Sequence, residues 1–303
     1  MSRHRPRTWP ATPRSLAGHV MDDHTHLPLR EPDIPLVDGE RMPLDEQLAR
    51  AAEVGVEWIV TSACEVPDFE PALTLARTHT GIRVALAVHP NEAALHAGIV
   101  DPSPDGLVPQ RREYHVPLVE ALEMVACRLD DPMVVAVGET GLDHFRTAPS
   151  GWDAQEESFR AHLEMSRLHD LPLQIHDRDA HEDTLGVLAQ SATHGQRIVF
   201  HCFSGDRAMA RVLAENDWYA SFAGNVTYPS NGELRAALEE LPRELVLVET
   251  DAPYLTPVPE RGNPNASYAM AHTVRAIAGS WQVSEEEACR RLAANSRRVY
   301  GTW

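Results

Sequence analysis

The chain has 303 residues, of which 43% are hydrophobic, and its formal net charge at pH 7 is -18. This length and apolar content suffice for the core of one large α/β domain or of two smaller ones. The negative charge argues against broad, nonspecific binding to a long polyanion, because such binding depends on many Lys and Arg contacts with phosphates. A nucleic-acid substrate would therefore have to be held locally.

All 27 basic residues are arginine, and the sequence contains no lysine. This absence excludes a phosphate-binding loop that needs its Lys. It also excludes a Schiff-base nucleophile and a carbamylated Lys that bridges two metal ions.

Residues 1–17 contain Arg and Pro but lack the apolar centre of a secretory signal. We expect them to form a disordered extension before a single domain that covers residues 18–303. No apolar run approaches the roughly 18 residues needed to span a bilayer. The four cysteines form no CxxC pair. The pattern favours a cytoplasmic protein with reduced thiols and no membrane partner, with a monomer as the default.

Short apolar runs then alternate with amphipathic stretches. Eight strands are predicted, at residues 20–21, 56–60, 83–88, 133–137, 171–175, 197–200, 218–221 and 245–248. Helical spacing of apolar residues predicts helices at 44–52, 117–128, 155–168, 183–189, 207–214 and 231–240. This alternation predicts an α/β fold, a single (β/α)₈ TIM barrel. An open doubly wound sheet is the alternative, but no GxGxxG motif supports it. Residues 97–116 and 252–267 are predicted to be long loops.

Ionisable residues follow the predicted strands, at the end where barrel enzymes place their catalytic groups. His24 and His26 are two residues apart in an extended segment, so their side chains project to the same side. The same end of four later strands would carry Glu139, His176, His201 and Asp251.

Each of these residues also has an ordinary structural explanation. An HxH pair can arise by chance, a strand-end carboxylate commonly caps a turn, and a single His more often forms a hydrogen bond than binds a metal. Their common placement at the ends of five strands favours a metal site instead. Mixed nitrogen and oxygen ligands suit Zn, Mn, Ni, Co or Fe, whereas Mg prefers more oxygen.

Six ordered motifs in this chain resemble those of the TatD-type hydrolases, which belong to the amidohydrolase-like barrels. They are Asp22-x-His24-x-His26-Leu27, Val88-His89-Pro90, Gly138-Glu139-Thr140-Gly141-Leu142-Asp143, Ile175-His176-x-Arg178-x-Ala180, His201-Cys202-Phe203-Ser204-Gly205 and Glu249-Thr250-Asp251-Ala252-Pro253-Tyr254-Leu255. The resemblance covers nearly all of residues 21–301.

The resemblance implies a site for two divalent cations, drawn from Mg, Mn, Zn, Ni and Co. One cation would be bound by His24, His26, Glu139 and Asp251, and the other by Glu139, His176 and His201. Glu139 would bridge the two ions, which agrees with the absence of lysine. The implied substrates are phosphodiesters at the 3′ end of a nucleic acid or a similar nucleotide. A 3′-to-5′ deoxyribonuclease activity is typical of the family, and aminoacyl-tRNA deacylation is a variant.

Asp251 and Glu139 are the predicted catalytic residues. Two cations would lower the pKa of a bound water and polarise the P–O bond, and Asp251 would accept the proton as general base. Arg178 could pair with the phosphate through its planar guanidinium, with a surface salt bridge as an equal alternative.

Further contacts are predicted with less specific signals. His89, Ser204 and Asn225 are candidates to bind substrate, although the same residue types are common in ordinary turns. Glu92 and Asp143 are candidates to orient the ligand imidazoles.

The chain departs from the family pattern near the substrate. Asn91 replaces a usual His, His144 a usual Tyr, Ala266-Ser267 a usual Glu-Pro, and Pro28 a usual Asp. Two other functions therefore stay open, namely hydrolysis of another ester, amide or lactone bond and a barrel that has lost catalysis. A Ser-His-Asp hydrolase is disfavoured because no GxSxG motif is present.

Overall fold

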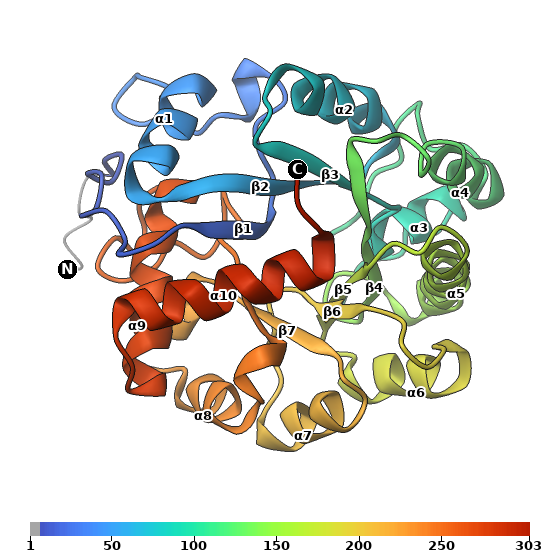
Figure 1. Ribbon diagram of the computed structural model, residues 1–303. Coiled ribbons are helices and arrows are strands. Elements are labelled where there is room, and N and C mark those ends of the chain that lie inside the picture. Colours follow the sequence, from blue (N-terminus) through green and yellow to red (C-terminus); the bar gives the residue numbers. More distant parts are fainter. Residues whose placement is uncertain (1–6) are drawn as a thin grey trace.

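A computed structural model describes residues 7–303. Eight parallel strands form one sheet in which each strand pairs with the next in chain order (Figure 1). The strands are β1 (Val20–Thr25), β2 (Val56–Ala63), β3 (Ile82–Leu86), β4 (Val134–Asp143), β5 (Leu173–Arg178), β6 (Ile198–Phe200), β7 (Tyr219–Phe222) and β8 (Val246–Val248). This order confirms the predicted eight-stranded α/β barrel.

The first and last strands meet through hydrogen bonds near and beyond their ends. Asp251 N donates to His24 O at 3.1 Å, and His26 N donates to Ala252 O at 2.8 Å. The buried Asp23 carboxylate accepts from Val248 N at 3.3 Å. These contacts nearly close the barrel, and they bring the segment after β8 against the one after β1.

Helices surround the strands (Figure 1). They are α1 (Leu44–Val54), α2 (Phe69–Thr78), α3 (Pro90–His96), α4 (Leu118–Ala126), α5 (Trp152–Leu168), α6 (His181–Ser191), α7 (Arg207–Glu215), α8 (Gly232–Glu240), α9 (Met270–Trp281) and α10 (Glu285–Tyr300). Short 3-10 turns occur at Glu31–Asp33, Val66–Asp68, Pro149–Gly151, Gly224–Thr227, Arg243–Leu245 and Ser267–Ala269. The six predicted helices are present, whereas α2, α3, α9 and α10 were not predicted.

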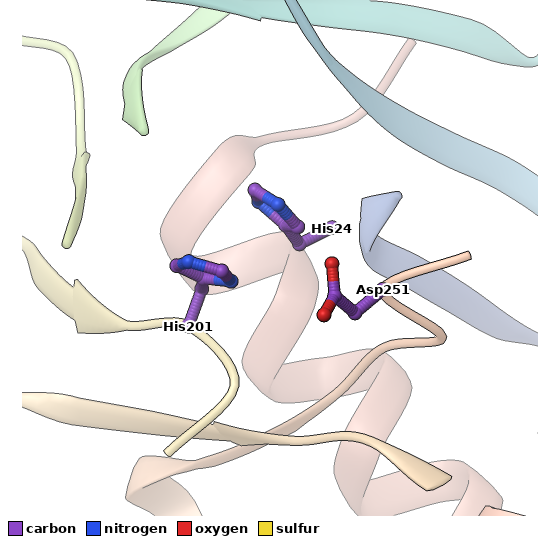
Figure 2. Close-up of side chains that lie close together, drawn as sticks. All are labelled: His24, His201 and Asp251. Atoms are coloured by element: carbon purple, nitrogen blue, oxygen red, sulfur yellow. The ribbon is translucent and has the colours of Figure 1, made fainter. Parts of the chain in front are cut away.

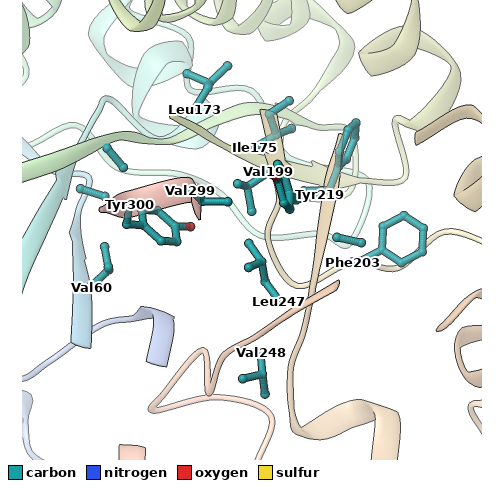
Figure 3. Close-up of a cluster of buried hydrophobic side chains, with 14 of the residues drawn as sticks. Val60, Leu173, Ile175, Val199, Phe203, Tyr219, Leu247, Val248, Val299 and Tyr300 are labelled. Atoms are coloured by element: carbon teal, nitrogen blue, oxygen red, sulfur yellow. The ribbon is translucent and has the colours of Figure 1, made fainter. Parts of the chain in front are cut away.

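The last helix, α10, covers the N-terminal end of the barrel. Its start is fixed by Ser284, whose hydroxyl accepts from Glu287 N at 3.1 Å. Asn295 Nδ2 donates to Val246 O at 2.8 Å, at the first residue of β8. Val299 and Tyr300 belong to the buried apolar cluster of the barrel (Figure 3). With this end covered, the opposite end of the barrel is the one that can hold an open site.

Residues 7–17 correct part of the predicted disordered extension. They form no helix or strand, but Leu16 N donates to Val54 O at 2.9 Å, and Tyr268 Oη donates to Pro10 O at 3.1 Å. Trp9 packs against the core. The prediction was wrong here because a segment without periodicity can still be fixed by contacts with distant segments. Residues 1–6 of the predicted extension lie outside the described residues.

Within residues 7–303, no helix combines the length and the apolar character that crossing a bilayer requires.

His162 on α5 gives the fold a pH dependence that can be measured. Its side chain is fully buried, with Nε2 accepting from Val88 N at 3.1 Å and Nδ1 donating to Ser158 O at 2.7 Å. Burial lowers the pKa of His162 from 6.5 to about 4. The unfolded chain therefore binds this proton at a higher pH than the folded protein. Stability should fall as the pH drops from about 6.5 to about 4, by about 3 kcal/mol from this group alone.

We expect His162→Gln to lose less stability than the wild type between pH 7 and pH 4.5, when urea unfolding of the metal-free protein is followed by circular dichroism. His194→Gln, at an exposed position, is the control and should keep the wild-type dependence. Equal pH dependence in the wild type and His162→Gln would contradict this assignment.

Candidate metal centre

The six predicted ligands converge at the C-terminal end of the barrel. Three of them, His24, Glu139 and His176, lie within β1, β4 and β5, and three, His26, His201 and Asp251, follow β1, β6 and β8. Figure 2 shows the side chains of His24, His201 and Asp251 close together. The shared placement that the sequence analysis inferred is thus observed.

The sequence predicted that Glu139 follows a strand that ends at residue 137. In the structure Glu139 instead lies inside β4. β4 continues to Asp143, and its ladder with β5 shifts register between Val137 and Thr140. A Cβ atom on Gly138 would lie 2.5 Å from Gln174 Cβ, and one on Gly141 would lie 2.1 Å from His176 O. Glycine is therefore required at both positions for β4 to approach β5 this closely.

The Glu139 carboxylate occupies the centre of the cluster. Its Oε1 lies 3.2 Å from His26 Nε2 and 3.7 Å from His24 Nε2. Its Oε2 lies 2.6 Å from His201 Nε2 and 3.1 Å from His176 Nδ1. Each carboxylate oxygen thus faces a different pair of imidazoles.

Gln174 on β5 fixes the orientation of His24. Gln174 Nε2 donates to Asp23 O at 2.8 Å and to Tyr300 Oη at 2.9 Å. The amide oxygen is therefore the atom that lies 2.9 Å from His24 Nδ1, so Nδ1 carries the proton. His24 Nε2 is left with a free lone pair, buried and without a hydrogen-bond partner.

Asp143 has the corresponding role for His176. Its Oδ2 lies 3.1 Å from His176 Nε2 and accepts from Asn91 Nδ2 at 3.3 Å. Glu92, the other residue expected to orient a ligand, instead lies 2.9 Å from the Nε2 of His115. The structure therefore corrects the expectation for Glu92, because its side chain is turned toward the 97–116 loop.

His201 has a carboxylate neighbour that the sequence analysis missed. Its Nδ1 lies 3.7 Å from Glu249 Oε1, and the same oxygen accepts from Cys202 N at 2.7 Å. Glu249 is the first residue of the motif that contains Asp251, so the sequence could have indicated that Glu249 lies near the site. The sequence contained no such indication for Gln174, because this residue lies between apolar residues of a strand.

Among residues 7–303, three groups of donor atoms lie close enough together to bind a metal ion. They are His24, His201 and Asp251; His24, His26 and Glu139; and His89, Glu139 and His176. In each group the donor atoms lie within 4.8 Å of one another. His89, predicted as a substrate contact, therefore shares a group with two predicted ligands.

The electrostatics of the cluster favour added positive charge. Burial lowers the pKa of His24 to about 3, and the charge of His201 adds to this effect. Burial also disfavours a charged His26, but the nearby carboxylates of Asp251 and Glu139 favour the charged form more strongly, and they raise the pKa of His26 to about 10. The pKa of Glu139 is held well below its usual range despite burial, because His201 and the other imidazoles surround it. The protons on the neighbouring imidazoles thus balance the charge of the buried Glu139 carboxylate, and a bound cation could balance it in their place.

The cluster forms part of the floor of a cavity of about 1040 Å³. Arg178, Ser204 and Asn225, the other predicted substrate contacts, all line it. The Ser204 hydroxyl donates to Asp177 O at 3.4 Å, and Asn225 Oδ1 is buried without a partner. These residues are therefore placed where a substrate could reach them.

Comparison with known proteins agrees with this geometry. Residues 21–301 match the sequence model of the family described as TatD related DNase. A Mycobacterium tuberculosis protein named as an uncharacterized metal-dependent hydrolase TatD is 34% identical over 291 residues, which are 93% of this chain and 98% of that protein. A Klebsiella pneumoniae protein named 3′-5′ ssDNA/RNA exonuclease TatD is 28% identical over 263 residues, which are 85% of this chain and 91% of that protein.

The crystal structure of YJJV, a TatD homologue from Escherichia coli K12, superposes with a TM-score of 0.76. It is 25% identical, and the match covers 94% of this chain and 98% of that one. This chain belongs to the TatD family of metal-dependent hydrolases.

The departures from the TatD pattern differ in their distance from the site. Asn91, Ala266, Ser267 and Pro28 line the cavity. The His144 ring instead stacks on Trp152, with ring centroids 3.9 Å apart, and it is not among the cavity-lining residues. The exchange at His144 therefore affects packing behind the site.

The donors fit the divalent cations on which TatD hydrolases depend. His201 Nδ1 and Nε2 and His24 Nε2 are buried and lack a partner with hydrogen-bond geometry. A buried polar atom without a partner is costly, and coordination would satisfy these nitrogens. Imidazole and carboxylate donors in one cluster suit Zn, Mn, Ni, Co and Fe.

Gln174→Leu should weaken metal binding in this TatD-family protein. Without the amide oxygen, the imidazole of His24 is no longer held with Nε2 toward Glu139. Loss of such a hydrogen bond to a ligand His typically lowers metal affinity by about 10- to 100-fold. Competition with a chromophoric chelator for Zn or Mn measures this affinity. Gln190→Leu, on the outer surface of α6, is the matched control, and equal losses in both variants would contradict the role of Gln174.

Proposed function

We propose that this TatD-family hydrolase is a phosphodiesterase that removes nucleotides from the 3′ end of single-stranded DNA or a related nucleic acid. The observation that carries the proposal is the Glu139 carboxylate, with one oxygen toward His24 and His26 and the other toward His176 and His201. Such a carboxylate is suited to bridge two cations. The name of the Klebsiella pneumoniae relative supports the choice of substrate.

His24, His26, Glu139 and Asp251 would bind one cation, and Glu139, His176 and His201 the other. The Nε2 of His89 lies 3.9 Å from Glu139 Oε2. His89 is therefore at the edge of the set of ligands proposed for the second cation. When bound, the two cations supply an activated water and polarise the phosphate.

Asp251 would accept the proton of the attacking water. Its amide nitrogen is anchored to His24 O at 3.1 Å, and its Oδ1 lies 3.6 Å from His26 Nε2. The carboxylate therefore has a fixed position at the floor of the cavity. A carboxylate held in this way can act as a general base.

Four residues would bind the substrate. Arg178 offers a guanidinium to a phosphate, and His89 offers the Nε2 that remains after its Nδ1 accepts from Asn91 N at 3.1 Å. Ser204 and Asn225 would provide polar contacts from the segments that follow β6 and β7. The four cysteines are free thiols, which supports a cytoplasmic location.

The test is the release of nucleotides from a 3′-labelled single-stranded oligonucleotide. We expect activity with Mn, Co, Ni, Zn or Mg after metal reconstitution, and its loss in EDTA. Asp251→Asn should lower the rate at least about 100-fold, the scale of a lost general base. The surface variant Asp45→Asn should keep the wild-type rate.

No release of nucleotides with any of these metals would overturn the proposal. Cleavage of aminoacyl esters, amides or lactones by the same metal-loaded protein, with none of phosphodiesters, would assign the site to carbonyl chemistry.

A further inference from the structure

We propose that Arg146 and Arg178, gathered over the ring of Phe145, form an anion subsite that binds a second phosphate of the substrate, beside the phosphate that is cleaved. The inference rests on the proposed phosphodiesterase function and deepens it. It makes the substrate class a nucleotide chain with at least one phosphate in addition to the scissile one.

Arg178 is an available cation at the cavity wall. Its guanidinium carbon lies 4.1 Å from the centroid of the Phe145 ring, an arrangement that supports a cation–π interaction. Among the described residues, no carboxylate pairs with it, whereas Arg30 in the same cavity is 2.7 Å from Asp68. Arg178 is also exposed, so its donors are free for a ligand.

Arg146 adds a second guanidinium to the same ring. Its guanidinium carbon lies 5.6 Å from the Phe145 centroid, and its side chain lines the same cavity. One of its nitrogens, Nη1, lies 3.0 Å from Asp105 in the 97–116 loop. A guanidinium carries five N–H donors, so this pair orients Arg146 and leaves donors for an anion.

One carboxylate connects this pair of arginines to the metal centre. Asp143 Oδ1 accepts from Phe145 N at 3.0 Å and from Arg146 N at 2.7 Å, while its Oδ2 lies 3.1 Å from His176 Nε2. Arg178 is the partner of Asp143 in the β4–β5 ladder. The arginines therefore have a fixed position relative to the predicted metal ligands.

The charge of the remaining wall restricts where a phosphate can lie. Glu65, Asp68 and Glu92 line the cavity, but Asp68 is paired with Arg30 and burial raises the pKa of Glu92 to about 8. The Glu65 carboxylate accepts only the neutral Tyr114 hydroxyl, at 2.8 Å, among the described contacts, so its negative charge is not compensated. A polyanion is repelled from this side. The planar guanidinium fork matches phosphate geometry, so the next phosphate is directed to the side of Arg146 and Arg178.

Two substrates separate this subsite from the cleavage site. Bis(p-nitrophenyl) phosphate contains only the scissile phosphate, whereas the 5′-phosphorylated dinucleotide pTpT contains a second one. For metal-loaded protein, Arg146→Gln should raise the KM for pTpT by about 10- to 100-fold, the scale of a hydrogen bond to a charged group. The kcat for pTpT, and both constants for the aryl diester, should stay within about threefold. Arg178→Gln should raise the same KM.

Binding to metal-free protein gives a readout that does not depend on hydrolysis. Thymidine 5′-monophosphate should bind the EDTA-treated wild type in calorimetry at millimolar concentration, and Arg178→Gln should lose this binding. Arg167→Gln, which replaces an exposed arginine paired with Glu164 on α5, is the control and should behave as the wild type. Thermal unfolding checks that all variants are folded.

The two proposals fail in different ways. Absence of hydrolysis of both substrates overturns the phosphodiesterase function, even if thymidine 5′-monophosphate binds through Arg178. Equal losses on both substrates in folded Arg146→Gln, or wild-type binding of thymidine 5′-monophosphate that is absent or unaffected by Arg178→Gln, overturn the anion subsite.

Discussion

The buried carboxylate of Glu139 is the constraint on which the rest of the site depends. A carboxylate that is 3% exposed stays ionised only if positive charge surrounds it. Here the imidazoles of His26, His176 and His201 can do so, because the pKa of each is raised, whereas His24 stays neutral. They come from three separate strand regions of the barrel, so the charge balance of a single side chain requires that these strands be correctly placed.

The neighbouring polar residues fix the orientation of the imidazoles around Glu139. Gln174 selects one nitrogen of His24, and Asp143 and Glu249 lie against the outer nitrogens of His176 and His201. Gln174 in turn contacts Tyr300 of α10. The helix that covers one end of the barrel is thereby connected, through one amide, to the orientation of a ligand at the other end. Fold stability and site geometry share these contacts.

The cavity combines a metal centre with unequal charge on its walls. The uncompensated charge of Glu65 on one side would repel a polyanion, and the guanidinium groups of Arg146 and Arg178 lie on the side of β4 and β5. This asymmetry reconciles a chain of net charge -18 with a nucleic-acid substrate, because attraction is needed only over the few phosphates that enter the cavity. Broad binding along a polyanion is not needed for a site that acts on an end.

The sequence by itself determined the barrel, its eight strands and the identity of the six candidate ligands, because buried strands and amphipathic helices have distinct periods and parallel strands share one functional end. Only the tertiary structure decided that Glu139 lies within β4, that Glu92 turns away to His115, and that residues 7–17 are packed on the barrel. It alone revealed Gln174 and paired Arg146 with Arg178 through Phe145. These features depend on strand register, close backbone approach at Gly138 and Gly141, and contacts between segments far apart in the chain, none of which leaves a local pattern.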